Sequence, residues 1–385
     1  MSLDVVHLLA ELVACPSTNP RGAPPSAEYP GEAPLLRILE LFFKTRGARV
    51  IQEEVFPGRC NLLATFDGVD RSRTLLLNAH ADNVPQDGMT IPPFTPDIRD
   101  GKLYGRGATD PKGGMAAMLA ALDRFLAAGR PFPCRVCFAA TCNEECGADG
   151  AQALMRLHPG EFVAAVVAEP TDLEIVHLHK GALRFTIGAS GVAVHSSLPE
   201  RGVSAIRALC EVTARIEGPY RDSLLLRTHP QLGAPRVSVG VFHGGSQVNV
   251  VPDHAELQVD RRTLPGETVD SVQRELEEIL VAVQRDADPR LAFSCRLSEN
   301  YPPLDESPDS GIGRLVAEAA RRVLGQARFA VAPFGTDGGV FSSHGLPSLI
   351  IGPGSIRQAH TKDEFIDLAQ VRQAVDLYET ILTLA

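Results

Sequence analysis

The order of apolar strand and helix patterns along the chain is the feature that most restricts its fold. Through the first half, strand and helix signals alternate. Such alternation favours a mostly parallel sheet covered by helices. The expected strands are 49–55, 61–67, 74–79, 135–140 and 163–168, the expected helices are 1–14 and 111–128, and a loop rich in proline and glycine covers 15–34.

The pattern changes at about Gly181, where a self-contained unit begins that ends near Leu297. Its order is strand, helix, two strands, helix, strand, which is typical of an α+β (ferredoxin-like) domain. The expected strands are 183–189, 236–243, 255–261 and 291–297, and the expected helices are 204–216 and 269–285.

The last part of the chain returns to the first pattern, with an expected helix at 310–324, a strand at 348–351 and a helix at 368–384. A chain of 385 residues also exceeds what one hydrophobic core usually supports. We therefore expect an α/β domain formed by residues 1–179 and 299–385, with the α+β domain, residues 180–298, inserted into it.

The charge and the N-terminus limit the partners and the location. The net charge of −10 comes without any lysine- or arginine-rich stripe, so nucleic acid is not an expected partner. No apolar run is long enough to span a bilayer, and no membrane partner is expected. The amphipathic start, with Asp4 and Glu11, does not have the pattern of a signal peptide. We expect a cytoplasmic protein.

The eight cysteines are expected to be reduced thiols, because nothing indicates secretion. Cys134 and Cys137 form a CxxC pair, followed by Cys142 and Cys146, so a zinc knuckle has to be weighed. Segment 135–141 has the pattern of a buried strand, on which residues an odd number apart point to opposite faces. This argues against the knuckle.

His80 and Asp82 end the apolar run LLLNAHAD. Residues two apart at a strand end face the same way, so the Asp82 carboxylate can bond the imidazole and fix its tautomer for a metal. Taken alone, a histidine at a strand end is more often a satisfied polar residue. Asp110 has an ordinary interpretation as well, as a helix N-cap before proline, although its loop GRGATDPKGG is unusually rich in glycine.

Four further polar residues follow expected strands. Glu144 and Glu145 follow 135–140, Glu169 follows 163–168, and His360 follows 348–351. Solvated surface is the ordinary interpretation of the glutamate pair. Open α/β sheets, however, bind ligands beyond the carboxyl ends of their strands. Two histidines and three carboxylates without a thiolate suit a catalytic zinc site that tolerates cobalt or manganese.

The motifs resemble the family of co-catalytic zinc aminoacylases and carboxypeptidases that includes acetylornithine deacetylase, succinyl-diaminopimelate desuccinylase and carboxypeptidase G. The likeness runs from CPSTNP to QAHTKDEF. It implies a zinc-hydrolase catalytic domain with two Zn²⁺ per chain, or Co²⁺ or Mn²⁺ in their place. The implied ligands are His80, Asp110 and Glu169 for the first ion, and Asp110, Glu145 and His360 for the second. It also implies that Asp82 orients a ligand and that Glu144 is the general base. Asn143 stands where the family usually has aspartate.

The inserted domain resembles the lid of that family, which also forms a homodimer interface. His195 lies in GVAVHSSLPERG, Asn249 in GGSQVNVVPDHAEL and Arg262 in DRRTLPGE. The resemblance implies that His195 and Asn249 assist the oxyanion and that Arg262 receives the substrate carboxylate. Donors and a guanidinium suit these tasks. The substrate-facing loop implied by FGTDGG contains Thr336, Asp337 and Gly338.

The function implied is metal-assisted hydrolysis of the amide bond of an N-acyl amino acid, with Glu144 moving the proton from water to the leaving amine. HKGALRF, GPGSIRQAH and SSLPERGVSAI resemble acetylornithine deacetylases, which favours a short neutral acyl group. A desuccinylase, dipeptidase or carboxypeptidase is the alternative. A serine hydrolase is disfavoured because no GxSxG occurs. A binding module without catalysis is disfavoured because Glu144 and every implied ligand are present.

Overall fold

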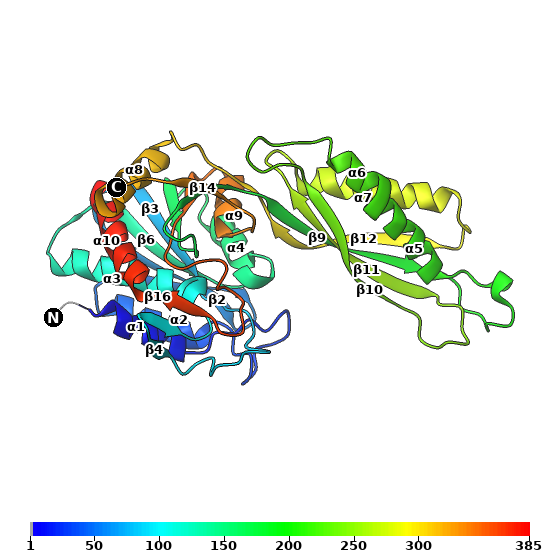
Figure 1. Ribbon diagram of the computed structural model, residues 1–385, viewed down its shortest axis with the longest axis horizontal. Helices are drawn as coiled ribbons and strands as arrows, with labels where there is room; N and C mark the ends of the chain where they lie inside the picture. Colours follow the sequence, from blue (N-terminus) through cyan, green and yellow to red (C-terminus); the bar gives the residue numbers. More distant parts are fainter. Residues whose placement is uncertain (1–2) are drawn as a thin grey trace. The chain divides into compact units, whose positions relative to one another are not determined.

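The computed structural model describes residues 3–385, which form two compact units (Figure 1). The first unit contains the chain up to Leu178 together with Leu304–Ala332 and Thr336–Ala385. The second contains His179–Pro303 and Pro333–Gly335. The second unit extends past the expected residue 298 because its last strand continues to Tyr301.

A nine-stranded sheet forms the centre of the first unit, in the order β1-β2-β6-β3-β7-β15-β8-β13, with β14 beside β8. Its strands are β1 (Arg49–Phe56), β2 (Arg59–Phe66), β3 (Gly68–His80), β6 (Phe132–Thr141), β7 (Ala164–Val167), β8 (Ile175–His179), β13 (Leu304–Asp305), β14 (Phe329–Ala332) and β15 (Ser348–Ile350). The central strands β6, β3, β7 and β15 are parallel, as expected, whereas β1, β2 and β8 are antiparallel to their neighbours. A small sheet holds β4 (Asp97–Arg99), β5 (Lys102–Tyr104) and β16 (Phe365–Asp367).

Both faces of this sheet are buried. Leu75, Leu77 and Phe138 belong to the main apolar core, and Leu76 and Cys137, which alternate with them, are buried on the opposite face. Near-continuous apolar runs of this kind are typical of parallel strands covered by helices on both sides. The described helices of this unit are α1 (Val5–Ala14), α2 (Ala33–Lys44), α3 (Gly113–Ala127), α4 (Asp149–Leu157), α8 (Gly311–Leu324), α9 (Asp337–Ser343) and α10 (Leu368–Leu384).

The first two helices differ from expectation. Residues 1 and 2 of the expected first helix lie outside the described residues, and Asp4 caps α1 by accepting from the Val6 N–H at 2.9 Å. Helix α2 was not expected, although its buried residues recur at helical spacing: Leu35, Leu36, Leu39, Phe42 and Phe43. Within residues 3–385, no helix has the length and hydropathy needed to cross a membrane.

The second unit has the expected α+β plan. Its sheet order is β10-β11-β9-β12 with antiparallel pairing throughout. The elements are β9 (Gly181–Ser190), α5 (Ala205–Arg215), α6 (Arg221–Leu224), β10 (Arg236–Gly244), β11 (His254–Thr263), α7 (Val269–Arg285) and β12 (Ala292–Tyr301). Along β11 the odd-numbered residues from Ala255 to Thr263 are buried and the even-numbered ones are not, so one face of the sheet forms the core with the helices.

All eight cysteines are free. Cys134 and Cys137 lie in β6, which is the strand expected for this segment. Among the described residues, the groups whose geometry could hold a metal ion contain histidine, aspartate and glutamate but no cysteine.

Candidate metal centre

The five residues expected to bind metal are brought together in the first unit, beyond the carboxyl ends of its parallel strands. His80 is the last residue of β3, Glu169 follows β7, and Glu145 lies in the short turn Glu144–Cys146 that follows β6. His360 follows β15, and Asp110 lies in the segment Ala108–Lys112 that precedes α3. The carboxyl ends of parallel strands meet at one edge of a sheet, which explains why residues so far apart in the sequence converge.

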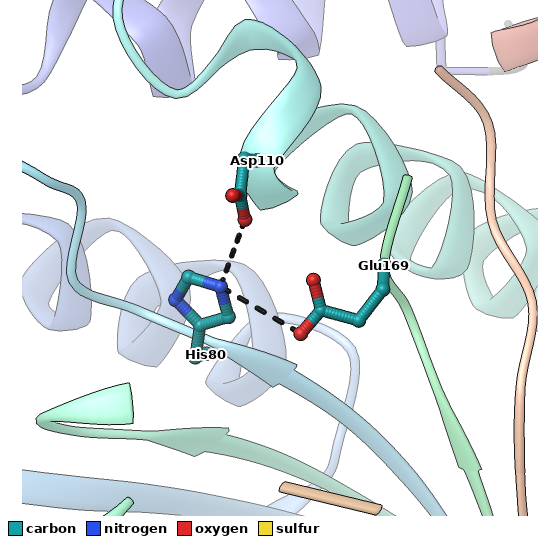
Figure 2. A group of neighbouring side chains, drawn as sticks. All are labelled: His80, Asp110 and Glu169. Atoms are coloured by element: carbon teal, nitrogen blue, oxygen red, sulfur yellow. Dashed lines mark hydrogen bonds and ion pairs between the residues drawn. The ribbon is translucent and has the colours of Figure 1, made fainter. Parts of the chain in front are cut away.

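The first group contains His80, Asp110 and Glu169 (Figure 2). His80 Nε2 lies 3.0 Å from Asp110 Oδ1 and 3.8 Å from Glu169 Oε1. All three residues are buried, and Glu169 Oε1 has no hydrogen-bond partner among the described residues. A buried carboxylate oxygen without a partner is costly unless a cation or a donor meets it.

The second group contains Asp110, Glu145 and His360. His360 Nε2 lies 3.2 Å from Asp110 Oδ2 and 3.2 Å from Glu145 Oε2. Asp110 therefore presents Oδ1 to one histidine and Oδ2 to the other. In each group the candidate ligand atoms lie within 4.8 Å of one another. One carboxylate shared between two groups is the arrangement that a bridged pair of metal ions requires.

Asp110 is not the helix N-cap that its sequence context suggested. Helix α3 begins at Gly113 with Lys112 in the cap position, and Asp110 has extended backbone angles (φ −126°, ψ 98°) followed by a cis peptide bond to Pro111. The segment before it is held instead by Glu364, whose carboxylate accepts the backbone N–H groups of Gly107, Thr109 and Asp110 at 3.0, 3.0 and 3.2 Å.

Glu364 also accepts from Arg106 Nη1 at 2.7 Å, and both side chains are almost completely buried. This residue was missed by sequence reasoning. Its position four residues after His360 in HTKDE was the available signal. Glu364 thus connects the two loops that carry Asp110 and His360.

Asp82 orients His80 in a different way from the one expected. His80 Nδ1 lies 2.9 Å from the backbone oxygen of Asp82, whereas the nearer carboxylate oxygen of Asp82 is 3.6 Å away. A carbonyl oxygen only accepts, so Nδ1 donates its proton there and Nε2 is left to face the metal group. The carboxylate itself accepts the backbone N–H groups of Glu144 and Glu145 at 3.0 and 3.1 Å.

Glu144 lies beside the metal groups but belongs to neither of them. Its Oε2 is 4.0 Å from His80 Nε2, and its side chain is 10% exposed. Burial raises the pKa of Glu144 well above its usual range, and the charges of Glu169 and Glu145 raise it further, while His80 opposes the shift. A buried carboxyl with a raised pKa suits the acceptance and return of a proton.

The charges of the buried carboxylates and histidines indicate whether metal ions fit the cluster. Burial also raises the pKa of Glu145 and of Glu169, and hydrogen bonds to Asp110 and Glu145 raise the pKa of His360 to about 11. The buried carboxylates also outnumber the two histidines, so the site attracts positive charge. Glu169 Oε1 also has no hydrogen-bond partner among the described residues, and together with the set of nitrogen and oxygen donors this fits a pair of divalent cations.

Thr336, Asp337 and Gly338 lie at the start of α9 and are buried. Thr336 caps the helix by accepting from the Gly338 N–H at 3.1 Å. Asp337 accepts from Thr141 Oγ1 at 2.5 Å, and Thr141 pairs with His80 across β6 and β3. Burial raises the pKa of Asp337 to about 6. In the structure the Asp337 side chain therefore supports the strand end that carries His80, and contact of Thr336, Asp337 and Gly338 with a substrate stays a prediction.

His195, Asn249 and Arg262 lie in the second unit. His195 and Asn249 are exposed neighbours, because His195 pairs with Val250 and the Ser196 N–H donates to the Asn249 carbonyl at 2.9 Å. Arg262 lies near the other end of β11, where its Nε donates to Asp260 Oδ1 at 2.7 Å. From His254 to Arg262 the strand spans about 26 Å, at roughly 3.3 Å per residue. Arg262 thus lies near the last residue of β11, whereas Asn249, with His195 beside it, precedes the first.

The chain resembles known proteins over almost all of its length. Residues 76–384 match the model of a family described as peptidase family M20/M25/M40. The chain is 33% identical to an acetylornithine deacetylase of Proteus mirabilis, over 97% of this chain and 94% of the relative.

Two solved structures share the fold. One is an M20 family metallo-carboxypeptidase from Sulfolobus solfataricus, with a TM-score of 0.78, 20% identity and 99% of each chain covered. The other is a dinuclear metal-binding peptidase from Bacillus subtilis, with a TM-score of 0.70, 17% identity, and 99% of this chain and 97% of that chain covered.

Proposed function

The chain belongs to peptidase family M20/M25/M40, and from this premise we propose that it hydrolyses the amide bond of N-acyl amino acids with two zinc ions per chain. The observation that carries the proposal is the position of Asp110. Its two carboxylate oxygens face His80 and His360 at 3.0 and 3.2 Å, and Glu144 lies beside both groups without belonging to either.

The chemistry follows from these positions. When bound, two zinc ions would polarise the acyl carbonyl and lower the pKa of water. His80, Asp110 and Glu169 would hold one ion, and Asp110, Glu145 and His360 the other. Glu144 takes the proton of the attacking water and gives it to the leaving nitrogen. A carboxyl group with a raised pKa suits this transfer. Asp82 keeps Glu144 and Glu145 in place through their backbone N–H groups.

We further propose a homodimer in which His195 and Asn249 serve the active site of the other subunit. The support is the arrangement of the second unit, where Arg262 lies near the last residue of β11 and Asn249, with His195 beside it, precedes the first. A small N-acyl amino acid does not span about 26 Å. Arg262 would bind the substrate carboxylate of one site, and the pair would stabilise the oxyanion of the other.

A mixed dimer tests this proposal separately from stability. Glu144→Ala and His195→Ala chains are unfolded together and refolded as a mixture, and the mixed dimer is isolated. If the site is shared, one site contains the intact Glu144 of one chain and the intact His195 of the other, and activity returns. If His195 acts within its own chain, every site keeps one lesion. No recovered activity, with dimers confirmed by light scattering, refutes the shared site.

For the acyl group we propose acetyl first, supported by the 33% identity to an acetylornithine deacetylase. Hydrolysis of a dipeptide or of a C-terminal peptide bond is the second candidate, supported by the likeness of the fold to a metallo-carboxypeptidase. A succinyl group is a weaker alternative. We also propose a cytoplasmic location, which the eight free cysteines support.

The deciding experiment is a screen of N-acetyl, N-succinyl and dipeptide substrates with zinc-loaded protein, with release of free amine as the readout. We expect the N-acetyl amino acids to have the largest kcat/KM. Elemental analysis of protein purified without chelator should find about two zinc equivalents per chain. Full activity in protein that contains no metal would rule out the mechanism.

A further inference from the structure

Asn143, directly before Glu144 and Glu145, is the position at which the sequence departs from the aspartate that is usual in the family. Its side-chain amide is fully hydrogen-bonded. Oδ1 accepts from Arg59 Nη1 and from Asn19 Nδ2, both at 2.9 Å. Nδ2 donates to the Cys146 carbonyl at 3.1 Å and to Asp149 Oδ2 at 2.7 Å. Arginine only donates and a carboxylate only accepts, so the amide has one possible orientation.

The backbone of Asn143 is just as constrained. Its φ of 60° lies in the left-handed region, which is uncommon outside glycine but accessible to asparagine. Its N–H donates to Glu32 Oε1 at 3.1 Å, and its carbonyl accepts from the Ala148 N–H at 2.9 Å. The next two N–H groups, of Glu144 and Glu145, donate to Asp82. The turn that carries both glutamates is therefore held at three consecutive residues.

The partners of Asn143 explain why an amide is needed. Glu32 and Arg59 form a buried pair, with Arg59 Nε donating to Glu32 Oε2 at 2.9 Å, so the charge of Arg59 is already matched. An aspartate at 143 would place a second carboxylate against Asp149. Like charges at hydrogen-bond distance repel.

We propose that Asn143 and Asp149 form a matched pair that positions Glu144 and Glu145, and that the neutral amide of Asn143 is required because the carboxylate opposite it is fixed at Asp149. Asn143 belongs to neither metal group. It acts as a positioning residue, through the turn that it holds. The proposal rests on the proposed function in one respect, namely that Glu144 is the base and Glu145 a metal ligand.

The test compares Asn143→Asp, Asp149→Asn and the double variant, each as the full chain. Asn143→Asp should lower kcat about tenfold or more, because residues in contact commonly have coupling energies large enough for a change of this size. KM should change less than about threefold. The substitution should also weaken binding of the second zinc equivalent, measured by calorimetric titration of the chelator-treated protein. Asp149→Asn keeps a side-chain oxygen as acceptor and should stay within about threefold of the parent in kcat.

The double variant decides the matter, because it restores one amide and one carboxylate to the pair. We expect its kcat and its affinity for the second zinc equivalent to return to within about threefold of Asp149→Asn. If Asn143→Asp leaves both quantities unchanged, or if the double variant is as impaired as Asn143→Asp while all variants keep the parent melting temperature, the proposal is wrong.

A failure of the proposed function has a different signature. In that case the parent itself would not hydrolyse the amide substrates, and kcat could not be compared between the variants. The zinc titration still decides on the pair, since it needs no substrate. A parent that is active while Asn143→Asp and parent bind zinc equally and turn over equally overturns the pair alone.

Discussion

The two units hold their candidate functional residues in contrasting ways. In the first, the side chains are mostly buried and have several partners from distant parts of the chain; Glu364 alone accepts four hydrogen bonds. In the second, the partners are local: His195 Nδ1 is bonded to Ser197, two residues away, and Arg262 to Asp260. Groups that hold a metal or move a proton act best when several contacts fix their positions, and the first unit fixes its candidate residues in this way. The contrast predicts which substitutions will be severe.

The largest effect should come from Glu144→Gln, because the amide cannot accept a proton. We expect kcat to fall by at least about a hundredfold, the low end of general-base contributions, with zinc content unchanged. The matched variant Glu145→Gln, one residue away in the same turn, should instead lose affinity for one zinc equivalent. Kinetics and elemental analysis of both variants make the check. Loss of zinc from Glu144→Gln would show that Glu144 is a ligand.

A large loss of stability should follow from Glu364→Gln. The substitution leaves the buried guanidinium of Arg106 without its counter-charge, and breaking a buried pair in this way costs about 3–5 kcal/mol. Urea unfolding of parent and variant measures the difference. If the free energy of unfolding changes by less than about 1 kcal/mol, the typical limit for exposed pairs, the buried network of the first unit is not what fixes Asp110.

A smaller effect is expected in the second unit from Arg262→Ala. Loss of a hydrogen-bonded charge should lower kcat/KM on N-acyl amino acids about tenfold or more. Analogues with an amide in place of the α-carboxylate should be hydrolysed equally by variant and parent. Arg296→Ala, on another strand of the same sheet, is the control. A loss on the amide analogues as large as on the carboxylates would assign Arg262 to the catalytic step or to the fold.

The smallest effect should come from Asp288→Asn, also in the second unit. Hydrogen bonds from the Arg290 side chain lower the pKa of Asp288 from 3.8 to about 2. The folded state therefore holds its proton less tightly than the unfolded state. The pair contributes stability above pH 3.8, and this is lost as the pH falls towards 2. The difference in melting temperature between parent and variant should be small at pH 6 and vanish at low pH. A difference that grows on acidification contradicts this assignment.

Local pattern was enough to predict most elements and the place of the site. Apolar runs such as 74–79 and 135–140 are strands because they are buried on both faces, and the polar residues that follow them meet at one sheet edge. His80 and Glu169 could be found in this way because a strand end fixes where its next residues go.

The supporting contacts could not be read from local pattern, because they join residues far apart in the chain. Glu32 meets Arg59 and Asn143, and Glu364 meets Gly107, with nothing in either neighbourhood that indicates the partner. For the same reason local pattern leaves Asp110 with two interpretations, helix cap and metal ligand, since aspartate before proline has the same sequence in both settings. Helix α2 is a different case, because the helical spacing of its buried residues is present in the sequence itself.

The path of the chain between the units has a consequence for folding order. The chain leaves the first unit after β8 and returns at β13, and His177 and Glu306, 129 residues apart, are hydrogen-bonded there. Closing a loop of that length costs about 4 kcal/mol of chain entropy. Within the second unit, Ala182 pairs with Tyr301, so folding of this unit brings the ends of the loop together in advance. Once the second unit has folded, its paired strands hold the two ends of this loop together, and less chain entropy is lost when the sheet that carries the candidate metal ligands is completed.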